Sequence, residues 1–256
     1  MRECGHLLDL DPDFRLCDEG EGHVMMAQVL EDVLEEQYQG IDPEGDFALL
    51  VDTLSAGRDD SRLAQIVLDV FGRIQSHPEP LRWLEEQKAA WELDGISDVG
   101  QTPWGALLLE DTARLGRDCV LEQAVGLCGE DELLEQNYAP SLQTTLEQVE
   151  ALCAAADRHS WDQVYACLPI PFPAVGRKRK RTRELSPMEE ARAQRAVERV
   201  KALRDGAKEQ LTRLGERFDG DSGQQLADLT EARPAVRGLM DLVARFQEAY
   251  QREKAR

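Results

Sequence analysis

Apolar residues recur every three or four positions along nearly the whole chain, and this spacing limits the folds that the chain can adopt. The stretch at 63–74 places its apolar side chains on one helical face, as do those at 142–156, 197–218 and 236–250. No stretch alternates apolar and polar residues with the period of two that a half-buried strand requires. Aromatic residues are only 5% of the chain, so the core must consist mainly of Leu, Val and Ala. The sequence therefore predicts an all-α, multi-helix fold with long helices and little or no sheet.

Helix starts and breaks are also marked in the sequence. Ser186, followed by Pro187 and then by Glu189, is typical of a capping box with proline at the first helical position. Thr102 and Pro103 predict a similar start. Breaks between helices are predicted at 40–43, 76–80, 95–100 and 137–140.

A proline-spaced stretch divides the chain. Pro169, Pro171 and Pro173 cannot lie inside a helix, and a run of basic residues follows them directly. We therefore predict three parts: an acidic helical bundle, a Pro-rich basic linker, and a long helical hairpin that packs back on the bundle. Their bounds are 1–168, 169–185 and 186–256.

Charge is distributed unevenly along the chain. The formal net charge is −20, with −26 in residues 1–168 and +6 in residues 169–256. The acidic part repels nucleic acid, whereas the basic part attracts it. The densest cluster of cations is a candidate site for contact with a DNA backbone, and its alternative interpretation is a solvated surface loop. Its members are Arg177, Lys178, Arg179, Lys180, Arg181 and Arg183.

Catalytic motifs are missing from the chain. A P-loop requires G-x-x-x-x-G-K-[ST], because glycine amides cradle the phosphates and the lysine neutralises them. The chain contains no such string, and it also lacks G-x-G-x-x-G, H-E-x-x-H and G-x-S-x-G. We therefore predict no catalytic residue in this chain.

Clusters of metal-ligating side chains are few. Glu31, Asp32, Glu35 and Glu36 could bind a divalent metal, but they lie opposite apolar residues and are interpreted as a solvated helix face. The four histidines are scattered, and the six cysteines have irregular spacings without C-x-x-C. We expect Cys17, Cys119, Cys128, Cys153 and Cys167 to be free thiols, and we predict no metal site.

Two tryptophans could serve nucleic-acid binding. Trp83 and Trp91 could stack on bases, but their helical context favours packing. We expect no signal peptide, and the chain contains no apolar run near the length of a membrane span. We therefore expect a cytoplasmic protein without a membrane partner, with its thiols reduced.

Several stretches resemble the AddA subunit of bacterial AddAB helicase–nucleases. The most specific is LDLDPDFRL at residues 8–16, and the others follow in the same order as in that family, whereas residues 95–160 match only as helix. The other matching stretches are GRDD at 57–60, SHPEP at 76–80, RDGAK at 204–208 and the segment 245–254.

The resemblance implies a position within a larger enzyme. In that family the motor is related to UvrD and RecB, and its ATP-binding P-loop precedes the segment that matches residues 8–16. The other helicase motifs and a nuclease domain follow the segment that matches the C-terminal residues. The chain is thus expected to be an inserted helical segment, the 1B-type subdomain, onto which no ATPase or nuclease residue of the family maps.

The implied parent is an ATP-dependent DNA helicase and exonuclease that acts in double-strand break repair and recombination. ATP and Mg²⁺ are implied for the parent, with no cofactor in this chain. The implied partners are duplex DNA, the rest of the motor and an AddB-type subunit. The competing hypothesis is an acidic helical scaffold that binds another protein and never contacts DNA.

Overall fold

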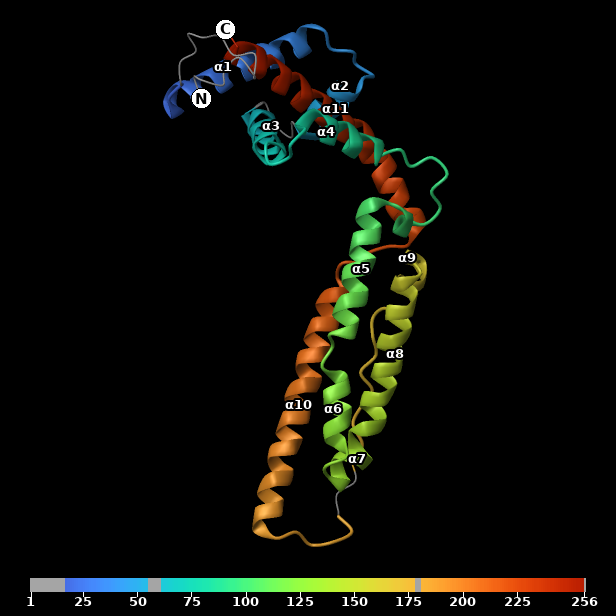
Figure 1. Cartoon of the computed structure of the whole chain (residues 1–256). Helices are drawn as coiled ribbons and strands as arrows, with labels where there is room; N and C mark the ends of the chain where they lie inside the picture. The colour runs from blue at the N-terminus through green and yellow to red at the C-terminus, as the bar shows by residue number, and fades with distance from the viewer. Residues whose placement is uncertain (1–16, 55–60, 178–180, 256) are drawn as a thin grey trace. The chain divides into compact units, whose positions relative to one another are not determined.

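The computed structural model describes residues 17–54, 61–177 and 181–255. These residues contain helices and no strand, so the predicted all-α fold is confirmed. The elements, in order, are α1 Glu19–Gln39, α2 Asp46–Leu54, α3 Ser61–Ile74, α4 Pro80–Ala89, η2 Val99–Gln101, α5 Pro103–Arg117, α6 Leu121–Cys128, α7 Glu132–Asn137, α8 Ala139–Asp157, α9 Trp161–Ala166, α10 Pro187–Gly215 and α11 Ser222–Lys254 (Figure 1).

The chain forms two compact units whose bounds differ from the predicted domains. The first unit combines Met1–Glu92 with Leu229–Arg256, and the second is the continuous segment Leu93–Asp228. Helix α10 lies in the second unit, whereas most of α11 contributes to the first. The segment 186–256, predicted as one hairpin, is therefore divided between two units.

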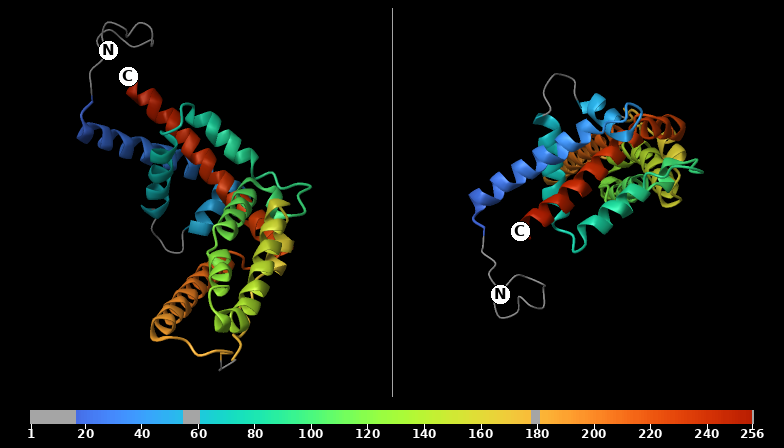
Figure 2. Two further views of the ribbon diagram at one scale, coloured as in Figure 1. Left: turned by 60° about the horizontal axis from the view of Figure 1, so that its bottom comes forward. Right: turned by 90° about the horizontal axis from the view of Figure 1, so that it is seen from above.

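The first unit has a core of aliphatic and aromatic side chains from segments far apart in the sequence. Residues of α1, α2, α3 and α4 pack against the C-terminal part of α11, which lies alongside α3 and α4 (Figure 2). The ring of Phe246 contacts that of Phe71 edge-on, with centroids 4.9 Å apart. Lys88 forms an ion pair with Asp241 of α11. The C-terminal helix therefore completes this core.

The second unit has a core made mainly of Leu, Val and Ala side chains, as the low aromatic content predicts, together with Trp161 and Phe218. Helix α5 packs along α8, and α10 packs along α6. Leu109, Leu142, Leu152 and Val200 are fully buried where these helices meet. Because all members of this core lie between residues 99 and 218, the unit is built from one continuous segment.

The predicted starts of two helices of the second unit are confirmed. The Ser186 hydroxyl accepts a hydrogen bond from the Glu189 backbone N–H, and the Glu189 carboxylate accepts one from the Ser186 backbone N–H at 2.8 Å. Thr102 caps α5 by accepting from the N–H of Gly105. Each cap satisfies amides that the first helical turn leaves unpaired. The proline-spaced stretch is non-helical as far as residue 177, as predicted.

Candidate nucleic-acid interface

The proline-spaced stretch that leads to the basic run is fixed along the second unit. The carbonyl of Pro173 accepts hydrogen bonds from the Ser141 hydroxyl at 2.7 Å and from the Arg204 guanidinium at 3.1 Å. The Thr145 hydroxyl donates to the carbonyl of Pro171 at 2.9 Å. This stretch, predicted to be a linker, therefore packs against α8 and α10.

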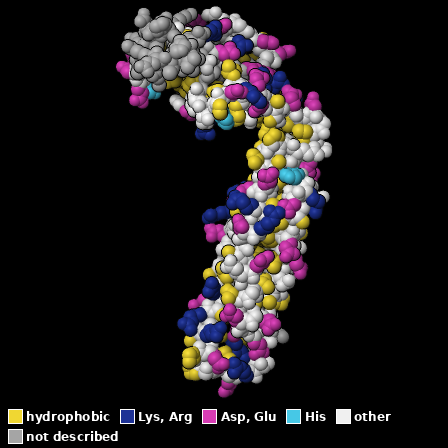
Figure 3. Space-filling model, in the orientation of Figure 1, with side chains coloured by type: hydrophobic (Ala, Val, Ile, Leu, Met, Phe, Trp, Pro, Cys, Tyr) yellow, Lys and Arg dark blue, Asp and Glu magenta, His cyan; other side chains and the backbone are white. Residues whose placement is uncertain are grey.

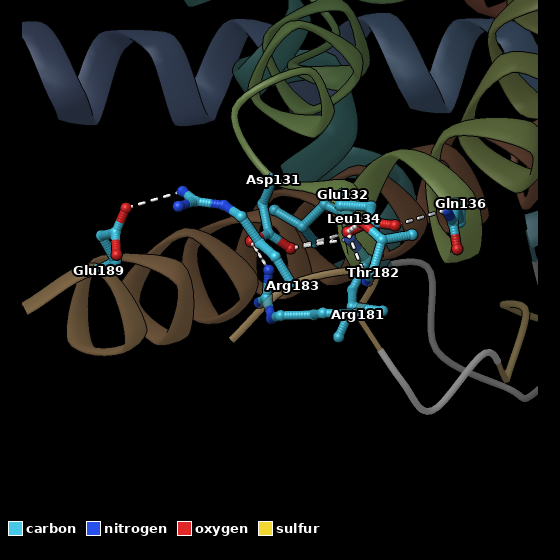
Figure 4. Close-up of polar contacts among 9 residues, drawn as sticks. Asp131, Glu132, Leu134, Gln136, Arg181, Thr182, Arg183 and Glu189 are labelled. Carbon is cyan, nitrogen blue, oxygen red and sulfur yellow. Dashed lines mark hydrogen bonds and ion pairs between the residues drawn. The ribbon is translucent and has the colours of Figure 1, made fainter. Parts of the chain in front are cut away.

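Helix α7 anchors the chain just before the basic run and again near the end of the run. Before the run, the Gly176 N–H donates to the carbonyl of Asn137, the last residue of α7, at 2.8 Å. Near the end of the run, the N–H and the hydroxyl of Thr182 donate to the carboxylate of Glu132, the first residue of α7, at 3.1 and 2.9 Å (Figure 4). The two ends of the run are thus tied to opposite ends of one short helix.

A buried ion pair strengthens the second anchor. Asp131, the N-cap of α7, accepts hydrogen bonds from the N–H groups of Leu133 and Leu134 with one oxygen, and its other oxygen pairs with Arg181 (Figure 4). The side chains of Asp131 and Arg181 are only 6% and 21% exposed. Because burying one of these charges without the other is costly, the pair holds Arg181 in place.

The carboxylates of this region are held in their charged forms. Burial opposes ionisation of Asp131, but hydrogen bonds from Arg181 and the α7 backbone outweigh it and lower its pKa. The backbone and hydroxyl of Thr182 lower the pKa of Glu132. The Ser186 backbone and hydroxyl, together with Arg183, lower the pKa of Glu189 to about 2. The anchors therefore persist throughout the neutral pH range.

The six predicted contact residues have different environments. Arg177 is exposed and has no ion-pair partner in the described part of the chain. Arg181 is paired with Asp131, and Arg183 is exposed and paired with Glu189 at 2.7 Å. Lys178, Arg179 and Lys180 lie outside the described residues. The second anchor, with its link from Asp131 to a residue 50 positions later, was not predicted from the sequence.

Comparison with known proteins identifies relatives, although no protein-family model matches the chain. The chain is 28% identical over 259 residues to an ATP-dependent helicase/nuclease subunit from Acetivibrio thermocellus, and 30% identical over 263 residues to the corresponding subunit from Bacillus pumilus. It is 26% identical over 257 residues to that from Ruminiclostridium cellulolyticum. The chain is similar to a part of the AddA-type helicase/nuclease subunit.

The similarity to this helicase/nuclease subunit covers 97–99% of the chain, so it extends over both units. In the other direction, the chain spans about a fifth of the length of these relatives, 19% and 20% in the first two. The resemblance noted in the sequence is thereby confirmed.

The other candidate residues either pack in a hydrophobic core or lie on the exposed surface of a helix. Trp83 packs against the first core, stacked on His77, as the packing interpretation predicts. The four carboxylates of α1 are exposed, whereas Val29, Leu30 and Val33 of the same helix are buried. Cys119, Cys128, Cys153 and Cys167 are free, and burial raises the pKa of each thiol.

Metal-ligand clusters and membrane-spanning helices are both missing from the described residues. No group of three or more His, Cys, Asp or Glu side chains in residues 17–54, 61–177 and 181–255 could hold a metal ion. Across the same residues, no helix combines the length and the apolar character needed to cross a bilayer.

Proposed function

We propose that the chain is the 1B-type helical subdomain of an AddA-type helicase/nuclease subunit that acts in double-strand break repair and recombination. It performs no chemistry itself, but it supports engagement of duplex DNA and contact with a partner subunit. The observation that carries the proposal is the similarity to such subunits over 97–99% of the chain. The anchored basic run supports it further.

The basic run suits contact with the phosphate backbone of DNA. Exposed Arg and Lys side chains neutralise phosphates and release condensed counterions, without reading the base sequence. The anchors on α7 fix Gly176 and Thr182, and Arg177, next to the first anchor, is exposed. Arg181 and Arg183 already have internal partners, so we assign the backbone contacts mainly to Arg177, Lys178, Arg179 and Lys180.

The chemistry of the whole protein lies outside this chain under the same proposal. ATP and Mg²⁺ act in the motor, the nuclease domain cuts the strands, and an AddB-type subunit completes the enzyme. We accordingly expect no ATP hydrolysis and no DNA cleavage by the 256-residue chain alone. Turnover above a protein-free control, with or without Mg²⁺, would contradict this part of the proposal.

One observation favours a second function. Residues 1–168 carry a net charge of −26, and the carboxylates of α1 are exposed. Such a surface repels DNA and attracts a basic protein. The alternative is therefore an acidic helical scaffold that binds a protein partner and never contacts DNA.

Titration of the chain with forked and blunt duplex DNA separates the two functions. The wild-type chain is compared with a variant in which Arg177, Lys178, Arg179 and Lys180 are changed to Ser. Fluorescence anisotropy is recorded at about 50 mM and about 200 mM salt, because each phosphate contact contributes about −0.9 to the log–log salt slope. We expect weak wild-type binding, since a net charge of −20 opposes approach, and a salt slope that is flatter by about 2 to 4 units in the variant.

The matched control removes the same number of cations from exposed positions of the first unit. It changes Arg62, Arg73, Arg82 and Arg252 to Ser, so its net charge equals that of the test variant. The proposal predicts that the control keeps most of the wild-type slope. Equal losses in both variants would reject the basic run as the contact, and no binding at about 50 mM salt would favour the acidic scaffold.

A further inference from the structure

Charges are segregated on the exposed side of α10. Arg192, Arg195 and Arg199 follow one another at spacings of three and four residues and therefore lie on one face. By the same spacing rule, a neighbouring acidic face is formed by Glu198, Asp205 and Glu209. Figure 3 shows Lys and Arg side chains gathered along the part of the surface that α10 forms.

The arginine face, Arg192, Arg195 and Arg199, is left largely without internal partners. Arg195 and Arg199 are exposed and make no ion pair in the described part of the chain. Arg192 is 78% exposed, and its nearest carboxylate, Glu130, is 3.9 Å away. The lack of ion pairs at these arginines is notable because the chain has 50 acidic and only 30 basic residues, so that carboxylates are abundant.

The surroundings of this face favour a nucleic acid over a protein. Protein interfaces have a core of buried apolar and aromatic anchors, whereas DNA interfaces are polar and strongly basic. Next along the same face come Ala202 and Gly206, and a Cβ placed on Gly206 would meet nothing within 4 Å. Small residues let a backbone approach the helix closely, and no aromatic residue stands between them and the arginines on this face.

The geometry also matches a repeating anion. A rise of about 1.5 Å per residue separates Arg192 from Arg199 by roughly 10 Å along a rigid helix. Phosphates of one DNA strand follow each other at about 3.4 Å of helix axis, so these arginines can reach several of them. The helix begins at the capping box, and Arg183, at the end of the basic run, is paired with Glu189 in its first turn. The arginine face thus continues from the basic run.

We propose that Arg192, Arg195 and Arg199 of α10 form a second contact with the phosphate backbone of duplex DNA, in line with the basic run. This inference rests on the proposed function, because it assumes that the chain engages DNA. It assigns α10 as the side of the second unit that faces the duplex.

The test compares two variants of α10. Each variant lacks two cations, and the two pairs of cations lie on different sides of the acidic face. One variant carries Arg195→Gln and Arg199→Gln. The matched control carries Lys201→Gln and Lys208→Gln, which are also exposed, also lack ion pairs in the described part of the chain, and lie on the far side of the acidic face. Both variants have the same net charge, and circular dichroism verifies that each keeps its helices.

Binding of the full 256-residue chain to a blunt duplex is measured at about 50 mM and about 200 mM salt. We expect the arginine variant to lose at least about tenfold in affinity at the lower salt and to flatten the slope by about 2 units, equally for unrelated DNA sequences. We expect the lysine control to change both quantities far less.

Each other outcome overturns a specific statement. Equal losses in the two variants would overturn the arginine contact while leaving the proposed function intact. Wild-type binding that is absent at the lower salt would overturn the proposed function itself. Poly-glutamate serves as the competing probe: a loss of its binding in the arginine variant, with DNA binding unchanged, would assign this face to an acidic protein and overturn the inference.

Discussion

The two units differ in how their hydrophobic cores are built. The first encloses its core with two segments that are distant in the sequence, and aromatic rings from α3 and α11 meet inside it. The second is one continuous segment whose core is mainly Leu, Val and Ala with one aromatic pair, Trp161 and Phe218, and it has polar anchors at the ends of its helices. Both are acidic, with 26 acidic and 13 basic residues in the first and 24 and 17 in the second.

This contrast bears on function. The cations of the second unit are concentrated after residue 168, in the basic run and on α10, whereas its first part is acidic. The part of this unit after residue 168 therefore attracts anions, although the unit as a whole is acidic. In the first unit, cations such as Lys88 and Arg237 form ion pairs with Asp241, Asp46 and Glu92. The first unit uses these cations for its own fold.

The largest difference between the two units is expected when their segments are produced separately. Residues 1–92 without 229–256 lack the helix that supplies Ala235, Leu242, Val243 and Phe246 to the first core. We expect this piece to lose cooperative thermal unfolding, while residues 93–228 alone keep it. Circular dichroism during heating measures both. A cooperative transition in residues 1–92 alone would show that α11 is dispensable for the first core.

The next effect comes from a single core residue. Phe246 is fully buried, and changing it to Ala should lower the free energy of unfolding by about 4 kcal/mol, because a cavity replaces the ring. Denaturant unfolding measures the loss, and hydrogen exchange should locate it in the first unit. Leu107→Ala is the control, since Leu107 is 65% exposed and its removal should cost less than about 0.5 kcal/mol.

The periodicity of the sequence predicted which faces of helices are buried, but it does not indicate what they pack against. The all-α fold, the caps at Ser186 and Thr102, and the non-helical stretch at Pro169 depend on neighbouring residues and were predictable. The contact between Phe71 and Phe246 joins residues 175 positions apart, and no local pattern encodes it. The division of the chain into two units also depends on contacts between residues that are distant in the sequence.

The candidate site shows the same limit. Cation density alone identified the basic run, including Arg181. Density does not distinguish an arginine that pairs with a buried Asp131 from one that remains exposed, because that difference depends on a helix start 50 residues earlier. The arginines of α10 are interspersed with glutamates in the sequence, and only their placement on the helix separates the two charges.

A smaller effect is expected at the anchor of the basic run. Asp131→Ala removes the N-cap of α7 and the partner of Arg181. A lost cap costs about 1 kcal/mol and a broken, fully buried pair costs about 3 to 5 kcal/mol. Because Arg181 keeps some access to water, we expect a loss of about 2 kcal/mol in the free energy of unfolding.

The pH dependence gives an independent check on this anchor. The folded pKa of Asp131 lies below its ordinary value of 3.8, so the carboxylate stabilises the fold above about pH 4. This contribution is lost as the pH falls through the folded pKa, and the gap between wild type and Asp131→Ala should narrow there. Glu130→Ala is the control, since its only ion pair in the described residues is the distant one with Arg192, and a loss of similar size would contradict the anchor.

The smallest expected effect is at the start of α10. Ser186→Ala removes the hydroxyl that caps this helix, and we expect a loss of about 1 kcal/mol in the free energy of unfolding. The Ser186 backbone N–H remains, and it is the main cause of the pKa of about 2 at Glu189. The pKa of Glu189 in the variant should therefore rise but stay below its ordinary value of 4.5, as carboxylate titration by NMR can measure. A lowered pKa in the folded state stabilises the fold at higher pH, and this contribution disappears as the pH falls from about 4.5 to about 2. A variant in which Glu189 titrates at its ordinary value would show that the hydroxyl alone orders this turn, and with it the N-terminal end of the arginine face.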